Sequence, residues 1–213
     1  IGVRDGNTIA LAECPSIGVD PDFQLRNDYL GKKRALHLFR MTSDEFFRDV
    51  NPAAIFGAPV DVAFLDGLHQ FEYLLRDFAN SEAVCAPNSL IMLDDCLPVN
   101  AEMTERLPKP ESRKDAELAA WWTGDVWKLI PILKKYRPDL RVICVDTRPT
   151  GTVCVTRLDP GSKVLTERFF EIVDDFVNQE INDANFAAFY ASIKMISGFD
   201  IMADFSASKW LGA

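Results

Sequence analysis

Short apolar runs alternate with segments of helical periodicity through most of the chain. Strand-length apolar runs lie at residues 17–20, 35–39, 60–65 and 89–93. Residues 42–50 open with a Thr-x-x-Glu capping box, and residues 71–84 carry apolar side chains at helical spacing. Strands that alternate with helices are typical of βαβ units. The pattern therefore predicts an α/β fold whose sheet is mostly parallel.

The second half of the chain predicts a helix and a hairpin. Residues 125–136 have helical spacing but contain Pro131, which should kink the helix. Residues 140–145 and 152–158 have the pattern of strands, and the Arg-Pro-Thr-Gly segment between them is typical of a turn. We therefore expect these two strands to form an antiparallel hairpin.

Two segments lie outside the alternation. Residues 97–123 are charged, contain prolines and follow a strand end, so we expect a lid or a substrate-binding loop there. Residues 163–213 are rich in phenylalanine and predict one or two amphipathic helices. These helices should pack on the sheet or on a second subunit, which would make the protein a homo-oligomer.

Composition narrows the class of protein. The 213 residues suit one large domain, and 48% of them are hydrophobic. A net charge of −9 argues against nucleic acid or an anionic membrane as a partner, because phosphates would be repelled. No run of 18 apolar residues occurs, so we expect no membrane span. Because the first residue is Ile rather than Met, we expect the first strand to be cut.

The five cysteines indicate the redox environment. They are scattered, odd in number and never arranged as Cys-x-x-Cys: Cys14, Cys85, Cys96, Cys144 and Cys154. This distribution favours reduced thiols in a cytoplasmic protein over a disulfide framework or a zinc site. A reactive role for Cys96 is the weaker interpretation, because no base adjoins it in the sequence.

A glycine turn and an acid predict a site for a nucleoside-bearing cofactor. Gly2 and Gly6 precede a helix start and would let the backbone approach a ligand closely. Asp20 ends the next strand, where a carboxylate can accept both hydroxyls of a ribose. The alternatives are an ordinary turn at Gly6 and an aspartate that merely begins a loop.

Three further aspartates follow strands of the predicted sheet. Asp66 follows residues 60–65 directly, and Asp94 and Asp95 follow residues 89–93. Because the carboxyl ends of parallel strands share one edge, the carboxylates should converge and need a cation between them. Oxygen ligands favour Mg²⁺, Ca²⁺ or Mn²⁺. The alternative is that these aspartates only bond backbone amides and cap loops.

His69 stands three residues after Asp66, beyond the same strand. There it could serve as a general base, because a neutral imidazole accepts a proton near pH 7. The alternatives are that it caps the helix beginning near Gln70 or packs against the lid.

Two stretches resemble a known family. VDVAFLDGLHQFEYLLRDF, followed by APNSLIMLDDCLP, resembles the DG-x-H branch of the class I S-adenosylmethionine-dependent methyltransferases. That branch includes natural-product O-methyltransferases and cephalosporin hydroxylase-like proteins. GDVWKLIPIL and RPDLRVICVDTRPTGTVCV resemble the same branch. The resemblance covers about residues 1–160, which implies a methyltransferase domain there and a helical extension over residues 161–213.

The resemblance implies a fold and a cofactor site. The fold is a Rossmann-like, doubly wound sheet of seven strands whose last hairpin is antiparallel. The residues implied for S-adenosylmethionine are Gly2, Gly6, Asp20, Met41, Thr42, Ser43 and Asp66.

It also implies a metal site and a catalytic position. Asp66, Asp94 and Asp95 match the metal triad of catechol O-methyltransferase-like enzymes, although the third ligand there is more often asparagine. His69 matches the position of a catalytic lysine, so His69 and Asp66 are the implied catalytic residues.

These observations predict an enzyme that methylates an oxygen of a small hydroxylated molecule with S-adenosylmethionine, assisted by Mg²⁺ or Mn²⁺. Three alternatives remain: a cephalosporin hydroxylase-like enzyme on the same fold, a nicotinamide dehydrogenase, and a non-catalytic cofactor-binding module. The missing Gly-x-Gly-x-x-Gly motif argues against the dehydrogenase.

Overall fold

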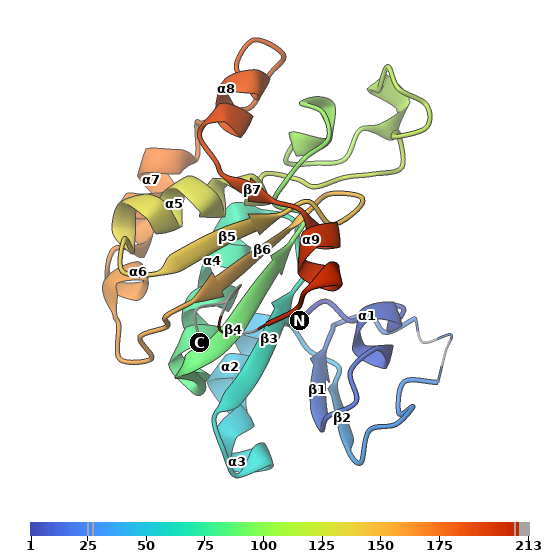
Figure 1. Cartoon of the computed structure of the whole chain (residues 1–213), viewed down its shortest axis with the longest axis vertical. Coiled ribbons are helices and arrows are strands. Elements are labelled where there is room, and N and C mark those ends of the chain that lie inside the picture. Colours follow the sequence, from blue (N-terminus) through green and yellow to red (C-terminus); the bar gives the residue numbers. More distant parts are fainter. Residues whose placement is uncertain (25, 27, 207, 209–213) are drawn as a thin grey trace.

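The strands in the described part of the chain form two separate sheets rather than the single seven-stranded sheet that the resemblance implied (Figure 1). The computed structural model describes residues 1–24, 26, 28–206 and 208. In this part of the chain a two-stranded parallel sheet holds β1 (Ser16–Val19) and β2 (Leu36–Phe39). The main sheet has the order β3-β4-β6-β5-β7. Its strands are β3 (Val60–Leu65), β4 (Cys85–Asp94), β5 (Arg141–Val145), β6 (Thr152–Thr156) and β7 (Met195–Ile196).

The direction of the strands confirms the predicted hairpin. β5 and β6 pair antiparallel, from Arg141 opposite Thr156 to Val145 opposite Thr152. β6 also pairs antiparallel with β4, whereas β3 pairs parallel with β4 and β5 parallel with β7. The carboxyl ends of β3 and β4 therefore lie at one edge of the sheet, next to the loop that joins β5 to β6.

Alternating side chains of the main sheet build a core on each face. Ile91 and Leu93 of β4 point into the larger core, together with α4 (Phe71–Val84) and α5 (Leu129–Tyr136). Leu90 and Met92 point to the other face, where Ile201 of α9 (Gly198–Ala203) also packs. Helices thus cover both faces, with α4 behind β3 and β4 in Figure 1 and α9 in front. This two-sided burial explains why the strands have near-continuous apolar sequences.

The remaining helices are short. They are α1 (Asn7–Ala10), α2 (Ser43–Asp49), α3 (Pro52–Phe56), α6 (Val164–Glu167), α7 (Phe169–Phe176) and α8 (Phe186–Ala191). Three 3-10 turns accompany them within the residues that the structure describes: η1 (Glu102–Thr104), η2 (Pro110–Ser112) and η3 (Val126–Lys128).

Two helix predictions need correction. The kinked helix over residues 125–136 is instead the turn η3 followed by α5, so Pro131 falls in the first turn of α5, where no amide donor is needed. The tail contains four short helices and the edge strand β7 in its described part, rather than one or two helices. Phe176 of α7 packs in the larger core, so the first part of the tail is continuous with the domain.

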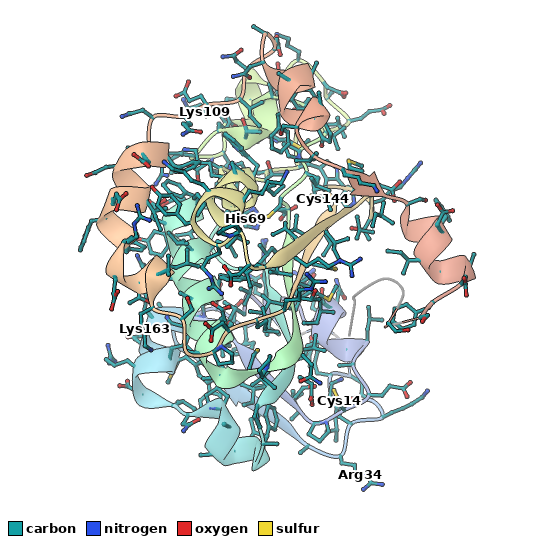
Figure 2. The ribbon with its side chains drawn as sticks, turned by 60° about the vertical axis from the view of Figure 1, so that its left-hand side comes forward. Cys14, Arg34, His69, Lys109, Cys144 and Lys163 are labelled. Atoms are coloured by element: carbon teal, nitrogen blue, oxygen red, sulfur yellow. The ribbon has the colours of Figure 1, made fainter. Side chains whose placement is uncertain are left out.

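The five cysteines are free thiols in the structure. Figure 2 shows Cys14 and Cys144 on separate parts of the molecule. Cys96 is fully buried, and this burial raises the pKa of its thiol well above the usual value. Such a thiol is inert, which supports the structural interpretation of Cys96. Among the described residues, no helix has both the length and the apolar character that crossing a bilayer requires.

Candidate functional site

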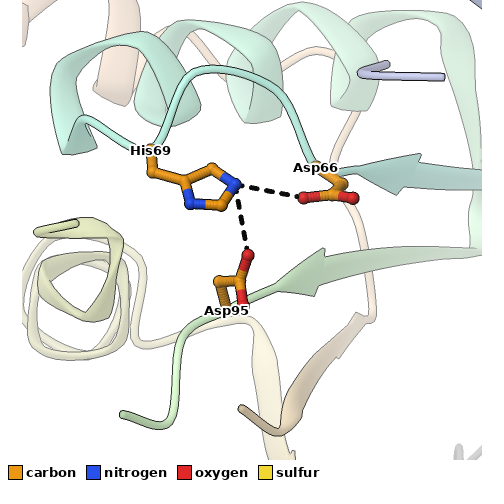
Figure 3. A group of neighbouring side chains, drawn as sticks. All are labelled: Asp66, His69 and Asp95. Atoms are coloured by element: carbon orange, nitrogen blue, oxygen red, sulfur yellow. Dashed lines mark hydrogen bonds and ion pairs between the residues drawn. The ribbon is translucent and has the colours of Figure 1, made fainter. Parts of the chain in front are cut away.

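Asp66, His69 and Asp95 converge at the carboxyl ends of β3 and β4 (Figure 3). His69 Nε2 lies 3.3 Å from Asp66 Oδ1 and 3.1 Å from Asp95 Oδ2. One ligand atom from each residue lies within 4.8 Å of the other two. The side chains of His69, Asp66 and Asp95 are 20%, 29% and 17% exposed, so solutes can reach a largely sheltered cluster.

The orientation of His69 is set by the segment between β4 and α5. Its Nδ1 donates to the carbonyl oxygen of Trp122 at 2.7 Å, because a carbonyl can only accept. The Trp122 indole stacks on the imidazole with ring centroids 5.0 Å apart. The neutral ring therefore keeps its hydrogen on Nδ1 and presents the Nε2 lone pair to the two carboxylates. The sequence analysis left two other roles for His69. The ring does pack against the segment predicted to be a lid, through Trp122, but it does not cap α4.

Charge controls the protonation of His69. Burial by itself lowers its pKa, but the hydrogen bond to Asp66 and the negative charges of Asp95 and Asp66 outweigh burial and raise the pKa above its usual value. A proton or a metal ion on Nε2 is thus favoured by both carboxylates. The same site would accept a proton at Nε2 once the ring is neutral.

The two neighbouring aspartates after β4 differ in their surroundings. Asp95 has a left-handed backbone (φ 58°), which turns its carboxylate toward His69, and the Thr150 hydroxyl donates to Asp95 Oδ1. Asp94 instead ends β4 and contacts the Thr152 hydroxyl at 3.5 Å. Burial, Asp95 and Asp66 raise the pKa of Asp94 to about 6. The sequence analysis predicted Asp66, Asp94 and Asp95 as the metal ligands. The structure instead brings Asp66 and Asp95 together with His69.

The glycine turn lies directly against this cluster. The Gly2 amide donates to the Val19 carbonyl, and a side chain on Gly2 would lie 1.7 Å from the Asp66 carbonyl oxygen. Gly2 has φ 75°, so both its space and its backbone angle require glycine. The turn thereby connects the end of β1 to the end of β3, and brings the predicted cofactor residues beside the predicted catalytic residues.

Asp20 organises the same turn. Its Oδ2 accepts from the Arg4 amide and its Oδ1 from the Asp22 amide, each at 2.7 Å. A carboxylate has about four lone-pair positions, so both oxygens can still accept from a ligand. The side chain is nearly buried, which fixes its direction.

The segment predicted to line the adenine begins α2. Thr42 forms the predicted capping box with Glu45: the Glu45 amide donates to Thr42 Oγ1 and the Thr42 amide donates to Glu45 Oε2. The Met41 amide donates to the Phe39 carbonyl at the end of β2. Met41, Thr42 and Ser43 therefore follow β2 as Asp20 follows β1, and their contact with a cofactor stays a prediction.

A buried ionic network, missed by the sequence analysis, supports His69 from behind. Asp125 Oδ1 accepts from the Phe71 amide at 2.9 Å, and Asp125 Oδ2 accepts from Arg106 and Lys128 at 2.8 and 2.9 Å. Arg106 also pairs with Glu72 at 2.5 Å. The network ties residues 97–123 to the start of α4, one residue after the loop that carries His69. The local sequence gives little signal for it, because its contacts other than the Asp125–Lys128 pair join positions 19 to 54 residues apart.

A substitution at Gly124 tests how closely the backbone at residue 124 packs against the backbone at His69. Gly124 has φ 58°, and a Cβ there would lie 1.8 Å from the His69 carbonyl oxygen. Gly57 has a similar φ of 70° with nothing within 4 Å, so it is a matched control. We expect Gly57→Ala to cost about 1–2 kcal/mol of left-handed strain. Gly124→Ala should cost clearly more in urea unfolding, because the backbone at His69 must also move. Equal losses of stability in the two variants would show that the backbone at His69 can move away from a side chain at position 124 without cost.

Comparison with known families gives a match over the first part of the chain. Residues 2–96 match a family described as a methyltransferase domain. The match spans the glycine turn, Asp20, Asp66, His69 and both aspartates after β4, and it confirms the resemblance to class I methyltransferases over this stretch. It does not separate the DG-x-H branch from the others. No curated protein matches the chain.

Proposed function

We propose that the protein transfers the methyl group of S-adenosylmethionine to an oxygen of a small hydroxylated molecule, assisted by a divalent cation. The observation that carries the proposal is the position of the Asp66–His69–Asp95 cluster against the Gly2 turn, within the segment that matches methyltransferases. A cofactor held by that turn would have its reactive end beside groups that can orient an acceptor and take its proton.

The cofactor would occupy the strand ends that the glycine turn connects. Gly2 and Gly6 let the turn pack closely against Asp66 and Tyr29, and Asp20 accepts from two amides and has lone pairs left for ribose hydroxyls. Met41, Thr42 and Ser43, after β2, would lie along the adenine. Asp66, after β3, adjoins the turn and would approach the methionine part.

The acceptor would lie over the cluster, close to His69 Nε2. The cofactor, when bound, would supply an electrophilic methyl group and leave as S-adenosylhomocysteine, and His69 Nε2 would take the proton that the acceptor oxygen loses. The Trp122 carbonyl holds Nδ1–H throughout and stabilises the charge that the ring gains. Holding the reacting atoms in line removes most of the entropic barrier, and the base adds about 10²-fold or more.

The donor set fits a divalent cation. Asp66 and Asp95 supply hard oxygen atoms, and His69 supplies a nitrogen whose other ring N–H is bonded to a backbone carbonyl, as is usual for metal-bound histidines. Asp66 and Asp95 would hold the ion, with Asp94 or His69 as the third ligand. Such an ion would lower the proton affinity of an acceptor hydroxyl. Nitrogen in the set favours Mn²⁺ over Mg²⁺.

Calorimetry with S-adenosylhomocysteine tests the cofactor assignment. We expect saturable binding, and we expect Asp20→Ala to weaken it by about 1–3 kcal/mol because charged hydrogen bonds are lost. Asp22→Ala, an exposed neighbour, is the matched control and should leave the affinity unchanged. Unaltered affinity in Asp20→Ala, or preferential binding of NADH by the parent protein, would refute the assignment.

A further inference from the structure

A buried arginine lies within the segment that covers His69. The side chain of Arg113 is only 2% exposed, although it belongs to the charged residues 97–123. Figure 1 shows this segment as the green and yellow-green loops at the top, beyond the carboxyl ends of β3 and β4. Residues 113–122, all of which the structure describes, contain no helix or strand. The path of the chain up to Trp122 therefore depends on side-chain contacts more than on a regular backbone ladder.

The guanidinium of Arg113 binds backbone carbonyls that lie just before Trp122. Its Nη1 donates to the carbonyls of Leu118 at 3.3 Å and Ala119 at 2.9 Å, and also to the carbonyl of Trp121. A buried guanidinium needs acceptors because an uncompensated charge is costly away from water. The bond to the Trp121 carbonyl fixes the peptide plane that directly precedes Trp122.

Arg113 also joins this loop to the residue that follows η1. Its Nη2 pairs with Glu105 Oε1 at 3.0 Å, and the Glu105 carbonyl accepts from the indole nitrogen of Trp122 at 2.6 Å. Trp122 is thus held twice, through the backbone before it and through its indole. His69 depends on both, because its Nδ1 donates to the Trp122 carbonyl and its ring stacks on the indole.

From these contacts we propose that Arg113 is a positioning residue, which holds Trp122 so that its carbonyl and its indole fix the His69 ring. The bonds of Arg113 go to Glu105 and to the carbonyls before Trp122, so it acts on His69 only through Trp122. Its effect on catalysis rests on the proposed methyl transfer, whereas the connection from Arg113 to His69 does not. A displacement of about 1 Å in a catalytic group can cost about 10²-fold in rate, so the hold on His69 matters for the chemistry.

This role requires arginine rather than another cation. The planar guanidinium directs Nη1 and Nη2 to acceptors on different sides at once. A lysine has one compact ammonium, which could bind either Glu105 or the carbonyl of Trp121 but would not connect the two as a fork does. The variant Arg113→Lys therefore keeps the charge and loses the connection, whereas Arg113→Met keeps only the apolar stem.

The first experiment observes His69 without cofactor or acceptor. The chain has two histidines, His37 and His69, so labelling histidine with ¹⁵N gives two sets of imidazole signals in NMR spectra. In Arg113→Met the Nδ1 proton of His69 should exchange with water about tenfold faster than in the parent, because the Trp122 carbonyl no longer holds it. Lys114→Met, which changes the next side chain in the same loop, is the matched control. That side chain is 81% exposed, and its replacement should leave the exchange rate unchanged.

The second experiment measures methyl transfer from labelled S-adenosylmethionine to a panel of small phenols and catechols. In Arg113→Met, kcat should fall about tenfold, because His69 Nε2 is present but no longer held in line with the acceptor. Affinity for S-adenosylhomocysteine should stay unchanged. If Arg113→Met does not fold, Arg113→Lys gives the same comparison.

The two experiments separate this proposal from the proposed function. Exchange of the His69 Nδ1 proton at the parent rate in a folded Arg113 variant would overturn the proposal, as would faster exchange with unchanged kcat. Faster exchange in the variant, together with a parent protein that methylates no acceptor, would refute the proposed methyl transfer and still support the connection from Arg113 to His69.

Discussion

Replacing His69 with alanine should lower methyl transfer by about 100-fold while leaving the affinity for S-adenosylhomocysteine nearly unchanged. The reason is that the His69 ring lies against Asp66 and Asp95 rather than against the cofactor turn, and a positioned base contributes about 10²–10⁴-fold. The measurement is transfer of labelled methyl groups from S-adenosylmethionine to a panel of small hydroxylated acceptors. His37→Ala, which removes the only other histidine from an exposed strand position, is the control.

The same variant separates two roles for His69, because one nitrogen cannot bind a metal and accept a proton at once. If His69 is the base, Mn²⁺ should still raise the Tm of His69→Ala, whereas Asp66→Asn and Asp95→Asn should abolish the Mn²⁺ effect. If His69 is a ligand, the Mn²⁺ effect should disappear in all three variants. Turnover by His69→Ala at the parent rate would contradict both roles.

The pH dependence of stability follows from the raised pKa of His69. The folded protein holds this proton more tightly than the unfolded chain does, because Asp66 and Asp95 attract the imidazolium more than burial repels it. The stabilisation is therefore complete below the ordinary pKa of about 6.5 and is lost as pH rises through the higher pKa of the folded state. In the absence of metal, the difference in unfolding free energy between the parent and His69→Ala should accordingly shrink with rising pH. Activity through a free base should rise over the same range.

Strands and helices could be predicted from the sequence where the spacing of apolar residues agreed with the polar residues that mark the ends of an element. Val60–Leu65 and Phe71–Val84 have the predicted bounds, because each is an apolar run with a clear polar limit. β4 begins at Cys85, four residues before the strand predicted at residues 89–93. In the structure this stretch pairs with β3 through an irregularity near Val60, which pattern alone does not reveal.

The sequence predicted which strand ends form the candidate site, but it did not predict the contacts between the side chains there. The rule that ligands gather at carboxyl ends placed Asp66, His69 and Asp95 together. It could not say which of Asp94 and Asp95 faces His69, because that depends on the left-handed backbone at Asp95. Nor could it find Asp125 or Thr150, whose contacts join positions more than 50 residues apart. Such partners are chosen by tertiary packing and leave no local periodicity.

The largest loss of stability should follow from Asp125→Ala. The side chains of Asp125 and Lys128 are 3% and 2% exposed, and their charged atoms lie 2.9 Å apart. Alanine would leave the Lys128 ammonium buried without its carboxylate, and would also remove the acceptor for the Phe71 amide that begins α4. Breaking a buried pair in this way costs about 3–5 kcal/mol, which urea unfolding can measure.

A double-mutant cycle shows that the loss comes from the stranded charge. Lys128→Met keeps the apolar stem of the lysine, so Asp125→Ala combined with Lys128→Met should recover much of the stability that Asp125→Ala loses. Glu13→Ala, which breaks the exposed pair of Glu13 with Lys32 at 2.6 Å, should cost less than about 1 kcal/mol. Because the Asp125 carboxylate accepts from the Phe71 amide two residues after His69, the double variant, which lacks this carboxylate, should still show reduced methyl transfer even where its stability returns. Full activity in the rescued protein would mean that the bond from Asp125 to Phe71 does not position His69.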